Sequence, residues 1–277
     1  MKKLVITLTL LVECLGWCLA PHLAISMGGI FQVASPANCC ITNDSGCTTS
    51  AINTTGATLL VATQGSTRTG FGGLTDSQSN NWQNALTAGG TYNYAGMWYA
   101  YAPTTSTSQT FSISGPNQIC VDVTAWSGTL TTSSVFDSTV TVLGGQSSVS
   151  GPYQPGSITP SGAEELVVSV FGGDTASGCV SGDSGFAINS GFNLLSAGCD
   201  ANDFLVDAAA VTAGTVNPTW SWSASYQFTA YGANAAFKPA LTPGGSSGRP
   251  RVWIITRLLH TIGRSSEYGP FGVLFGS

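Results

Sequence analysis

The chain has few charged residues and almost no bases away from its ends. Charged side chains make up 8% of its 277 residues, against roughly 25% in an average soluble domain. Residues 22–240 contain eleven acids but only two bases, Arg68 and Lys238, which gives a net charge of −9. Binding to a phosphate backbone requires several Lys or Arg contacts. The composition therefore excludes a nucleic-acid partner, and an anionic membrane surface would repel this segment.

Histidine is equally scarce, because His22 and His260 are the only two in the chain. The segment Gly182-Asp183-Ser184-Gly185 matches the nucleophile motif of chymotrypsin-like proteases, but that serine needs a histidine base. No histidine lies between His22 and His260, so we do not expect the serine to be activated. A zinc site is disfavoured for the same reason, and because no Cys-x-x-Cys pair is present.

Hydroxyl-bearing residues that alternate with apolar ones are abundant instead. Residues 219–231 (TWSWSASYQFTAY) place Trp220, Trp222 and Tyr226 on one face, which predicts a half-buried strand. Residues 119–126 alternate in the same way, and residues 166–171 form a continuous apolar run typical of a strand covered on both faces. Further strands are expected at residues 25–33, 58–63, 97–102, 111–113, 140–142, 186–195 and 204–206.

Clusters rich in Gly, Pro and Asn separate these segments, and neither a helix nor a fixed-period repeat stands out between residues 22 and 240. Ten or so strands at regular spacing predict an all-β domain. We expect a single antiparallel β-sandwich of jelly-roll type, supported by disulfides, over residues 22–240. Its solvent faces carry Ser and Thr in place of Lys, which leaves strand edges poorly protected against pairing with another chain.

The two ends of the chain differ from this central segment. Residues 1–21 combine a basic start, an apolar run and small residues near a cleavage site, which predicts a secretory signal peptide. We therefore expect a secreted protein, extracellular or at the cell surface. Residues 241–277 begin with a Gly- and Ser-rich linker and continue as a tail. Residues 253–260 suit a short amphipathic helix, the one place where membrane contact is expected; an unstructured end is the alternative.

Six cysteines remain after the signal peptide, and an even number in an exported chain predicts disulfides. They are Cys39, Cys40, Cys47, Cys120, Cys179 and Cys199. We expect one bridge between Cys179 and Cys199. A second bridge is expected from Cys47 to Cys39 or Cys40, with Cys120 taking the cysteine that is left.

The aromatic residues are the most suggestive set for ligand binding. Most are expected in the core, but β-sandwich modules also stack sugar rings on exposed aromatic side chains. The candidates for ligand contact are Trp82, Trp126, Tyr99 and Tyr101. Trp82 lies in a polar segment (SNNWQN), and Trp126 lies opposite the apolar face of its strand.

Acidic residues suggest two further sites. The oxygen-rich set Asp200, Asn202, Asp203 and Asp207 suggests Ca²⁺, the only cofactor we consider; turn capping without a metal is the alternative. A glycan hydrolase needs two carboxylates on either side of one bond. The adjacent Glu164 and Glu165 point to opposite faces of a strand and cannot form that pair. Asp122 with Glu165 is one pairing from distant strands, although solvated surface acids are the default interpretation.

The chain resembles secreted bacterial β-sandwich domains of jelly-roll and lectin-like types in three features. They are the run Trp98-Tyr99-Ala100-Tyr101, the Thr-rich alternating strands after it, and the end Ala235-Ala236-Phe237-Lys238. The resemblance covers roughly residues 23–240 and transfers no catalytic residue. We expect an extracellular binding or adhesion module rather than an enzyme, with neutral surface glycans as partners. The alternatives are a structural surface protein that self-associates through strand edges, and a secreted carboxylate- or calcium-dependent glycan hydrolase.

Overall fold

β-Strands make up nearly all the regular structure of the residues that can be described. The computed structural model describes residues 29–41, 46–66, 73–89, 94–114, 119–141, 146–149, 152–175, 185–199, 203–222 and 228–240. Within these ranges there is no α-helix, and the single 3₁₀ helix, η1, spans Ser133–Val135. The strand pairs are antiparallel throughout the described sheets. The all-β prediction is therefore confirmed.

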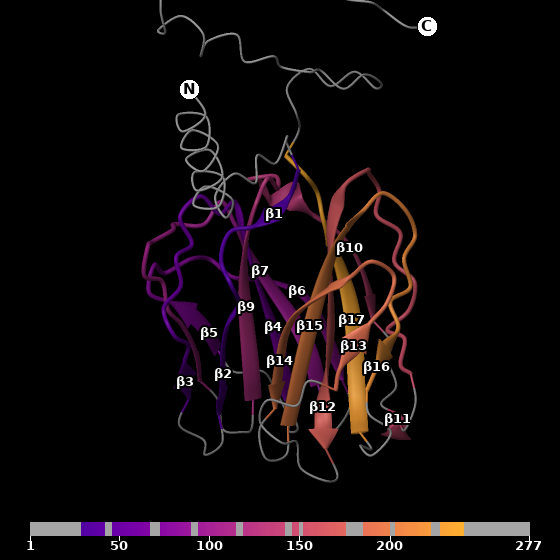
Figure 1. Cartoon of the computed structure of the whole chain (residues 1–277). Helices are drawn as coiled ribbons and strands as arrows, with labels where there is room; N and C mark the ends of the chain where they lie inside the picture. Colours follow the sequence, from indigo (N-terminus) through magenta and orange to yellow (C-terminus); the bar gives the residue numbers. More distant parts are fainter. Residues whose placement is uncertain are drawn as a thin grey trace, which may run out of the picture. The chain divides into compact units, whose positions relative to one another are not determined.

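Six strands form the first sheet (Figure 1). They are β1 (Phe31–Gln32), β2 (Ala37–Ile41), β4 (Leu59–Ser66), β6 (Gln83–Gly89), β7 (Tyr94–Tyr101) and β9 (Ile119–Ser127). Their order is β1-β9-β4-β7-β6, and β2 also pairs with β9. The central strand β4 pairs with β7 and β9 along its whole length.

The second sheet also has six strands. They are β10 (Phe136–Thr141), β11 (Gln146–Val149), β12 (Glu165–Thr175), β14 (Asn193–Cys199), β15 (Asp203–Thr212) and β17 (Phe228–Phe237). Their order is β10-β17-β12-β15-β14, and β11 also pairs with β17. The continuous apolar run at 166–171 lies in the central strand β12, where both faces are buried as predicted.

The main core lies between the two sheets. Leu59 and Met97 from the first sheet pack in one cluster with Leu166, Val168 and Phe237 from the second. Each fully buried side chain of this size stabilises the fold by roughly 1.5–3 kcal/mol. The sandwich prediction is confirmed by this face-to-face packing, whereas the finer jelly-roll assignment stays a prediction.

A small accessory sheet also covers part of the outer face of each sheet. β3 (Cys47–Thr48), β5 (Gly73–Asp76) and β8 (Phe111–Ser114) accompany the first sheet, where Phe111 packs with residues of β9. β13 (Ala187–Ile188) and β16 (Trp220–Ser221) accompany the second, where Trp220 is fully buried against β12. These extra layers bury both faces of β9, which its alternating sequence predicted to be half-buried.

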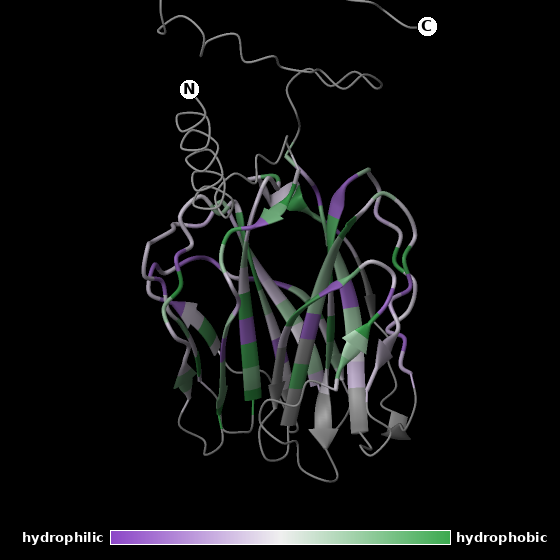
Figure 2. Ribbon diagram, in the orientation of Figure 1, coloured by the Kyte–Doolittle hydropathy of each residue, from purple (hydrophilic) through white to green (hydrophobic). Residues whose placement is uncertain are grey.

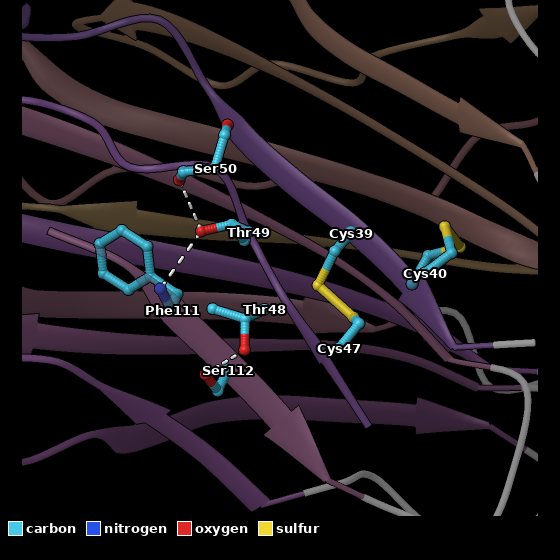
Figure 3. The surroundings of a disulfide bond; sticks show 9 residues. Cys39, Cys40, Cys47, Thr48, Thr49, Ser50, Phe111 and Ser112 are labelled. Carbon is cyan, nitrogen blue, oxygen red and sulfur yellow. Dashed lines mark hydrogen bonds between the residues drawn. A yellow bond between two sulfur atoms is a disulfide. The ribbon is translucent and has the colours of Figure 1, made fainter. Parts of the chain in front are cut away.

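Two disulfides fasten β2 to its neighbours, Cys39–Cys47 and Cys40–Cys120. Successive residues of a strand point to opposite faces, so Cys39 reaches β3 on the outer side while Cys40 turns towards the main core (Figure 3). Each bridge contributes about 2–4 kcal/mol. The predicted Cys47 bridge and the pairing of Cys120 with the remaining cysteine are confirmed. The side chains of Cys179 and Cys199, the other predicted bridge, lie outside the described residues.

The long strand predicted at 219–231 is two strands. Trp220–Ser221 form β16, which pairs with β13, and Phe228 begins β17, which pairs with β12 and continues to Phe237. Regular alternation cannot reveal this, because both halves bury one face. Similarly, the segment predicted at 186–195 divides into β13 and β14 at a turn where Gly191 has a φ of 78°.

The chain separates into one unit of residues 1–241, which contains both sheets, and a second of residues 242–277. The expected signal peptide at 1–21 and the expected amphipathic segment at 253–260 lie outside the described residues. Among the residues that are described, no helix has the length and apolar character needed to cross a bilayer.

Candidate functional site

Two of the four aromatic candidates lie in the core. Trp126 is 5% exposed and its indole N–H donates a 2.8 Å hydrogen bond to Thr124 Oγ1. Tyr99 stacks on Phe136 with a ring separation of 5.5 Å, and burial raises the pKa of its hydroxyl. Neither side chain can reach a ligand at the surface, which corrects the expectation for both. The reason is that strands β9 and β7 have no solvent face at these positions.

Tyr101 is half-buried at the margin of the same core. Its ring lies 6.5 Å from that of Tyr99, on the same face of β7. This face turns towards the second sheet, because Tyr99 packs there against Phe237. Tyr101 is therefore not grouped with Trp82, which belongs to the opposite, outer face of the first sheet.

Trp82 is half-buried and firmly held. Its indole Nε1 donates a 2.8 Å hydrogen bond to Asp76 Oδ2, and its ring meets Phe111 edge-on at 6.1 Å. Asp76 also accepts hydrogen bonds from Gln109 Nε2 and from the backbone N–H of Gln78. The carboxylate therefore fixes the orientation of an indole that remains partly accessible.

Trp98 was not among the four candidates, yet it lies on the same outer face. It is half-buried on β7, and it pairs in register with the exposed Asn84 of β6. Gln83 pairs with Tyr99, so Trp82 occupies the next position along, diagonal to Trp98. Diagonal neighbours in a sheet lie about 7–8 Å apart. The register, which a sequence does not reveal, places both indoles on the same outer face, where both pack against one core cluster.

Polar residues complete this surface, which we call the β6–β7 face and define as Trp82, Asn84, Thr87, Gly96 and Trp98. Asn84 Nδ2 donates a 3.2 Å hydrogen bond to the hydroxyl of Thr87, and both residues are exposed. Thr87 pairs with Gly96, which is itself buried. The result is a partly exposed aromatic surface bordered by an amide and a hydroxyl, with no charged side chain in the set.

Asp207 does not lie with Asp203, another residue of the predicted calcium site. That residue is 1% exposed, and its carboxylate lies between the sheets, where it accepts a 3.2 Å hydrogen bond from Thr63 Oγ1. Asp203 lies four residues earlier on the same strand, about 13 Å away at the usual strand rise, so the two cannot share one ion. Asp200, Asn202 and the side chain of Asp203 lie outside the described part. Within the described part, no group of three or more His, Cys, Asp or Glu could hold a metal.

Glu165 pairs with Asp137 and not with Asp122. The hydroxyl of Ser161 donates to Asp137 Oδ1 at 2.6 Å and to Glu165 Oε1 at 3.3 Å, and Lys238 Nζ lies 3.0 Å from Asp137 Oδ1. The serine thus fills the space that a substrate bond would need between two hydrolytic carboxylates. Gly162 N–H donates to Glu165 Oε1 at 2.7 Å, so this cluster also caps a turn.

The two acids of that cluster have pKa values shifted in opposite directions. Burial alone raises the pKa of Asp137, but hydrogen bonds from Ser161 and Lys238 outweigh it and lower the pKa to about 2. Burial raises the pKa of Glu165, with the nearby Asp137 adding to the effect. As the pH falls, Asp137 therefore keeps its charge beside Lys238 longer than Glu165 keeps its own.

Asp122 instead faces Asp207 across the main core, and each is 1% exposed. Burial raises the pKa of both carboxyl groups, that of Asp207 to about 7, and the proximity of Asp207 raises that of Asp122 further. This pair cannot be reached by a substrate from solvent.

Of these groupings, only the β6–β7 face combines accessible aromatic surface with exposed hydrogen-bonding groups. Aromatic side chains supply large contact areas at little conformational cost, and a few well-placed polar groups give orientation. The protease-like Asp183 and Ser184 lie outside the described residues. Comparison of the chain with protein-family models, curated proteins and solved structures finds no match.

Proposed function

We propose that this chain is a secreted or cell-surface β-sandwich module that binds a neutral glycan on the β6–β7 face. The observation that carries the proposal is the pairing of Trp98 with exposed Asn84 on an outer sheet face that also holds Trp82. An indole can stack on the apolar face of a sugar ring while amide and hydroxyl groups bond to sugar hydroxyls. The two disulfides fit an oxidising, extracytoplasmic setting.

The charge distribution favours a neutral ligand. Lys238 is the only Lys, Arg or His among the described residues, and it is engaged by Asp137. An anionic sugar or a phosphate group would therefore meet no free cation on the described surface, and the acidic body would repel it. A neutral glycan requires no such partner.

Affinity measurements on a panel of neutral polysaccharides test this function. Trp98→Ala removes the stacking surface, and we expect at least a tenfold loss of affinity, because central aromatic contacts commonly contribute about 2 kcal/mol or more. Asn84→Ala should weaken binding less, because one hydrogen bond is lost. The matched control is Phe31→Ala, which truncates an aromatic side chain that is 45% exposed on β1. Equal binding by the Trp98 and Phe31 variants, or no binding to any glycan, would remove the proposal.

A second function, self-association through strand edges, is favoured by one observation. β14 ends the order of the second sheet among the described strands, and it carries Leu194, which is 43% exposed, with no lysine or arginine. Lys on an edge strand opposes pairing with another chain. If the chain assembles into a filament or layer, light scattering should show concentration-dependent growth that Leu194→Lys abolishes. Monomeric behaviour of the unmodified chain at high concentration would exclude this function.

A further inference from the structure

The most unusual feature outside the β6–β7 face is a polar row through the main core. β9 and β15 each carry a hydrophilic band within an otherwise apolar strand (Figure 2). On the first sheet, Asp122 pairs with Asn38 on one side and with Thr63 on the other. On the second sheet, Asp207 pairs with Ser196. The sequence shows only isolated acids, because the two rows meet through the packing of the sheets.

Two hydrogen bonds cross between the sheets and align these rows. Thr63 Oγ1 donates to Asp207 Oδ2 at 3.2 Å, and Asn38 Nδ2 donates to Ser196 Oγ at 3.3 Å. Thr63 and Asn38, which flank Asp122 in the first sheet, thus bond to Asp207 and to Ser196, respectively. This cross-linking places the two carboxyl groups opposite each other in the middle of the row.

Within the described parts of the chain, the pair has no counter-ion. Among the described residues, Asp122 Oδ1, Asp122 Oδ2 and Asp207 Oδ1 accept no hydrogen bond of standard geometry. Two ionised carboxylates buried without a cation carry a penalty of several kcal/mol per ion. A proton shared between them removes one charge and supplies a hydrogen bond, as in carboxyl pairs where like charges cannot both ionise.

The described residues of the elements packed around the pair supply no cation that could offset its charge. β2, β4 and β14 contribute Asn38, Thr63 and Ser196, and the facing positions of β12 are the apolar Val168 and Val170. Asp203 lies four residues away on β15, about 13 Å along the strand, and would add negative charge only. Lys238 comes directly after β17 and forms an ion pair with Asp137. It lies five residues beyond Ala233, the residue of β17 that pairs with Val170.

We propose that Asp122 and Asp207 hold one proton between them at acidic and neutral pH. This shared proton forms a clasp that links β2 and β9 of the first sheet to β14 and β15 of the second. Loss of the proton at alkaline pH opens the clasp. Asn38 is exposed and Ser196 half-buried, so one end of the row reaches solvent and gives the proton a route in and out. The device makes the sandwich more stable in acidic than in alkaline surroundings. It is independent of glycan binding.

Unfolding measured at several pH values tests the clasp. Carboxyl groups with raised folded-state pKa values bind more protons in the folded than in the unfolded chain. The stabilising contribution of the protonated pair is then fully present below the unfolded-state pKa of about 3.9, and it is lost as the pH rises through the folded-state pKa. The unfolding constant of the unmodified chain should rise up to tenfold per pH unit per proton over that window. Asp207→Asn, which keeps a neutral hydrogen-bonding group opposite Asp122, should flatten this dependence, and Asp137→Asn should not.

A spectroscopic measurement keeps the proposal testable if Asp207→Asn does not fold. Infrared difference spectra of the unmodified chain at neutral pH should contain the C=O stretch of a buried protonated carboxyl, which Asp122→Asn should remove or shift. Hydrogen exchange at β2 and β14 should accelerate as the pair ionises, beyond the intrinsic pH effect. An unmodified chain equally stable at about pH 5 and about pH 8.5, or the absence of that carboxyl band, would overturn the clasp.

Discussion

Trp82 Nε1 and Asp76 Oδ2 lie 2.8 Å apart, and this hydrogen bond holds an indole at the margin of the β6–β7 face. Asp76 also bonds to Asn80, whose side chain both donates to and accepts from the backbone of Thr104. The anchoring therefore joins the segment before β6 to the segment after β7. A binding surface built on such a fixed aromatic side chain loses little conformational entropy when it takes up a ligand.

Trp82→Phe should destabilise the chain by about 1.5–3 kcal/mol, the usual contribution of a hydrogen bond to a charged group. Phenylalanine keeps an aromatic ring against Phe111 but removes the donor to Asp76. Urea unfolding measures the loss, and Phe31→Leu on exposed β1 is the control that should change stability little. A Trp82→Phe variant as stable as the parent would show that Asp76 does not anchor the indole.

Gly232→Ala should be strongly destabilising. A Cβ atom at this position would lie 2.6 Å from Tyr153 Cε1 and 3.1 Å from the backbone oxygen of Val170, and Tyr153 is held there because its hydroxyl accepts a hydrogen bond from Gly232 N–H. Overpacking of a well-packed site typically costs about 1–3 kcal/mol. Gly214→Ala is the matched control, because an added Cβ meets nothing within 4 Å there. Similar thermal midpoints for the two variants would contradict the packing described for β17.

Asp137→Asn should remove stability at neutral pH and have little effect in strong acid. The folded-state pKa of Asp137 is lowered to about 2, so its contribution is fully present above the unfolded value of about 3.9 and is lost as the pH falls through about 2. The sign is opposite to that of the Asp122–Asp207 pair. Unfolding curves at a series of acidic pH values should converge for parent and variant towards about pH 2. Parallel curves would show that the contacts with Ser161 and Lys238 do not shift this pKa.

The fold class could be predicted from the sequence because many of its strands carry a strong local pattern of apolar residues. The apolar run in β12 and the alternation in β9 predict their strands, and an even set of cysteines predicts disulfides. In the accessory sheets, β8 was predicted at residues 111–113, but β3 and β5 left no such signal. Strand pairs as short as Trp220–Ser221 with Ala187–Ile188 are set by tertiary packing and not by local periodicity.

The site was harder to predict because it depends on register. Trp98 and Trp126 each alternate with apolar neighbours, so sequence alone gives no reason to prefer one as a surface residue. The structure buries Trp126 between the two sheets and leaves Trp98 half-buried beside Asn84. Asp122 and Asp207 are 85 positions apart in the sequence, and only the packing of the sheets brings them face to face.

The most direct test of glycan binding is NMR of the indole N–H groups during titration with a neutral oligosaccharide. The indole N–H signals of Trp82 and Trp98 have internal controls in those of the buried Trp126 and Trp220. We predict that the Trp98 and Trp82 signals shift with ligand concentration while the Trp126 and Trp220 signals stay in place. Saturable binding that leaves both Trp98 and Trp82 unshifted would contradict the assignment of the ligand to this face.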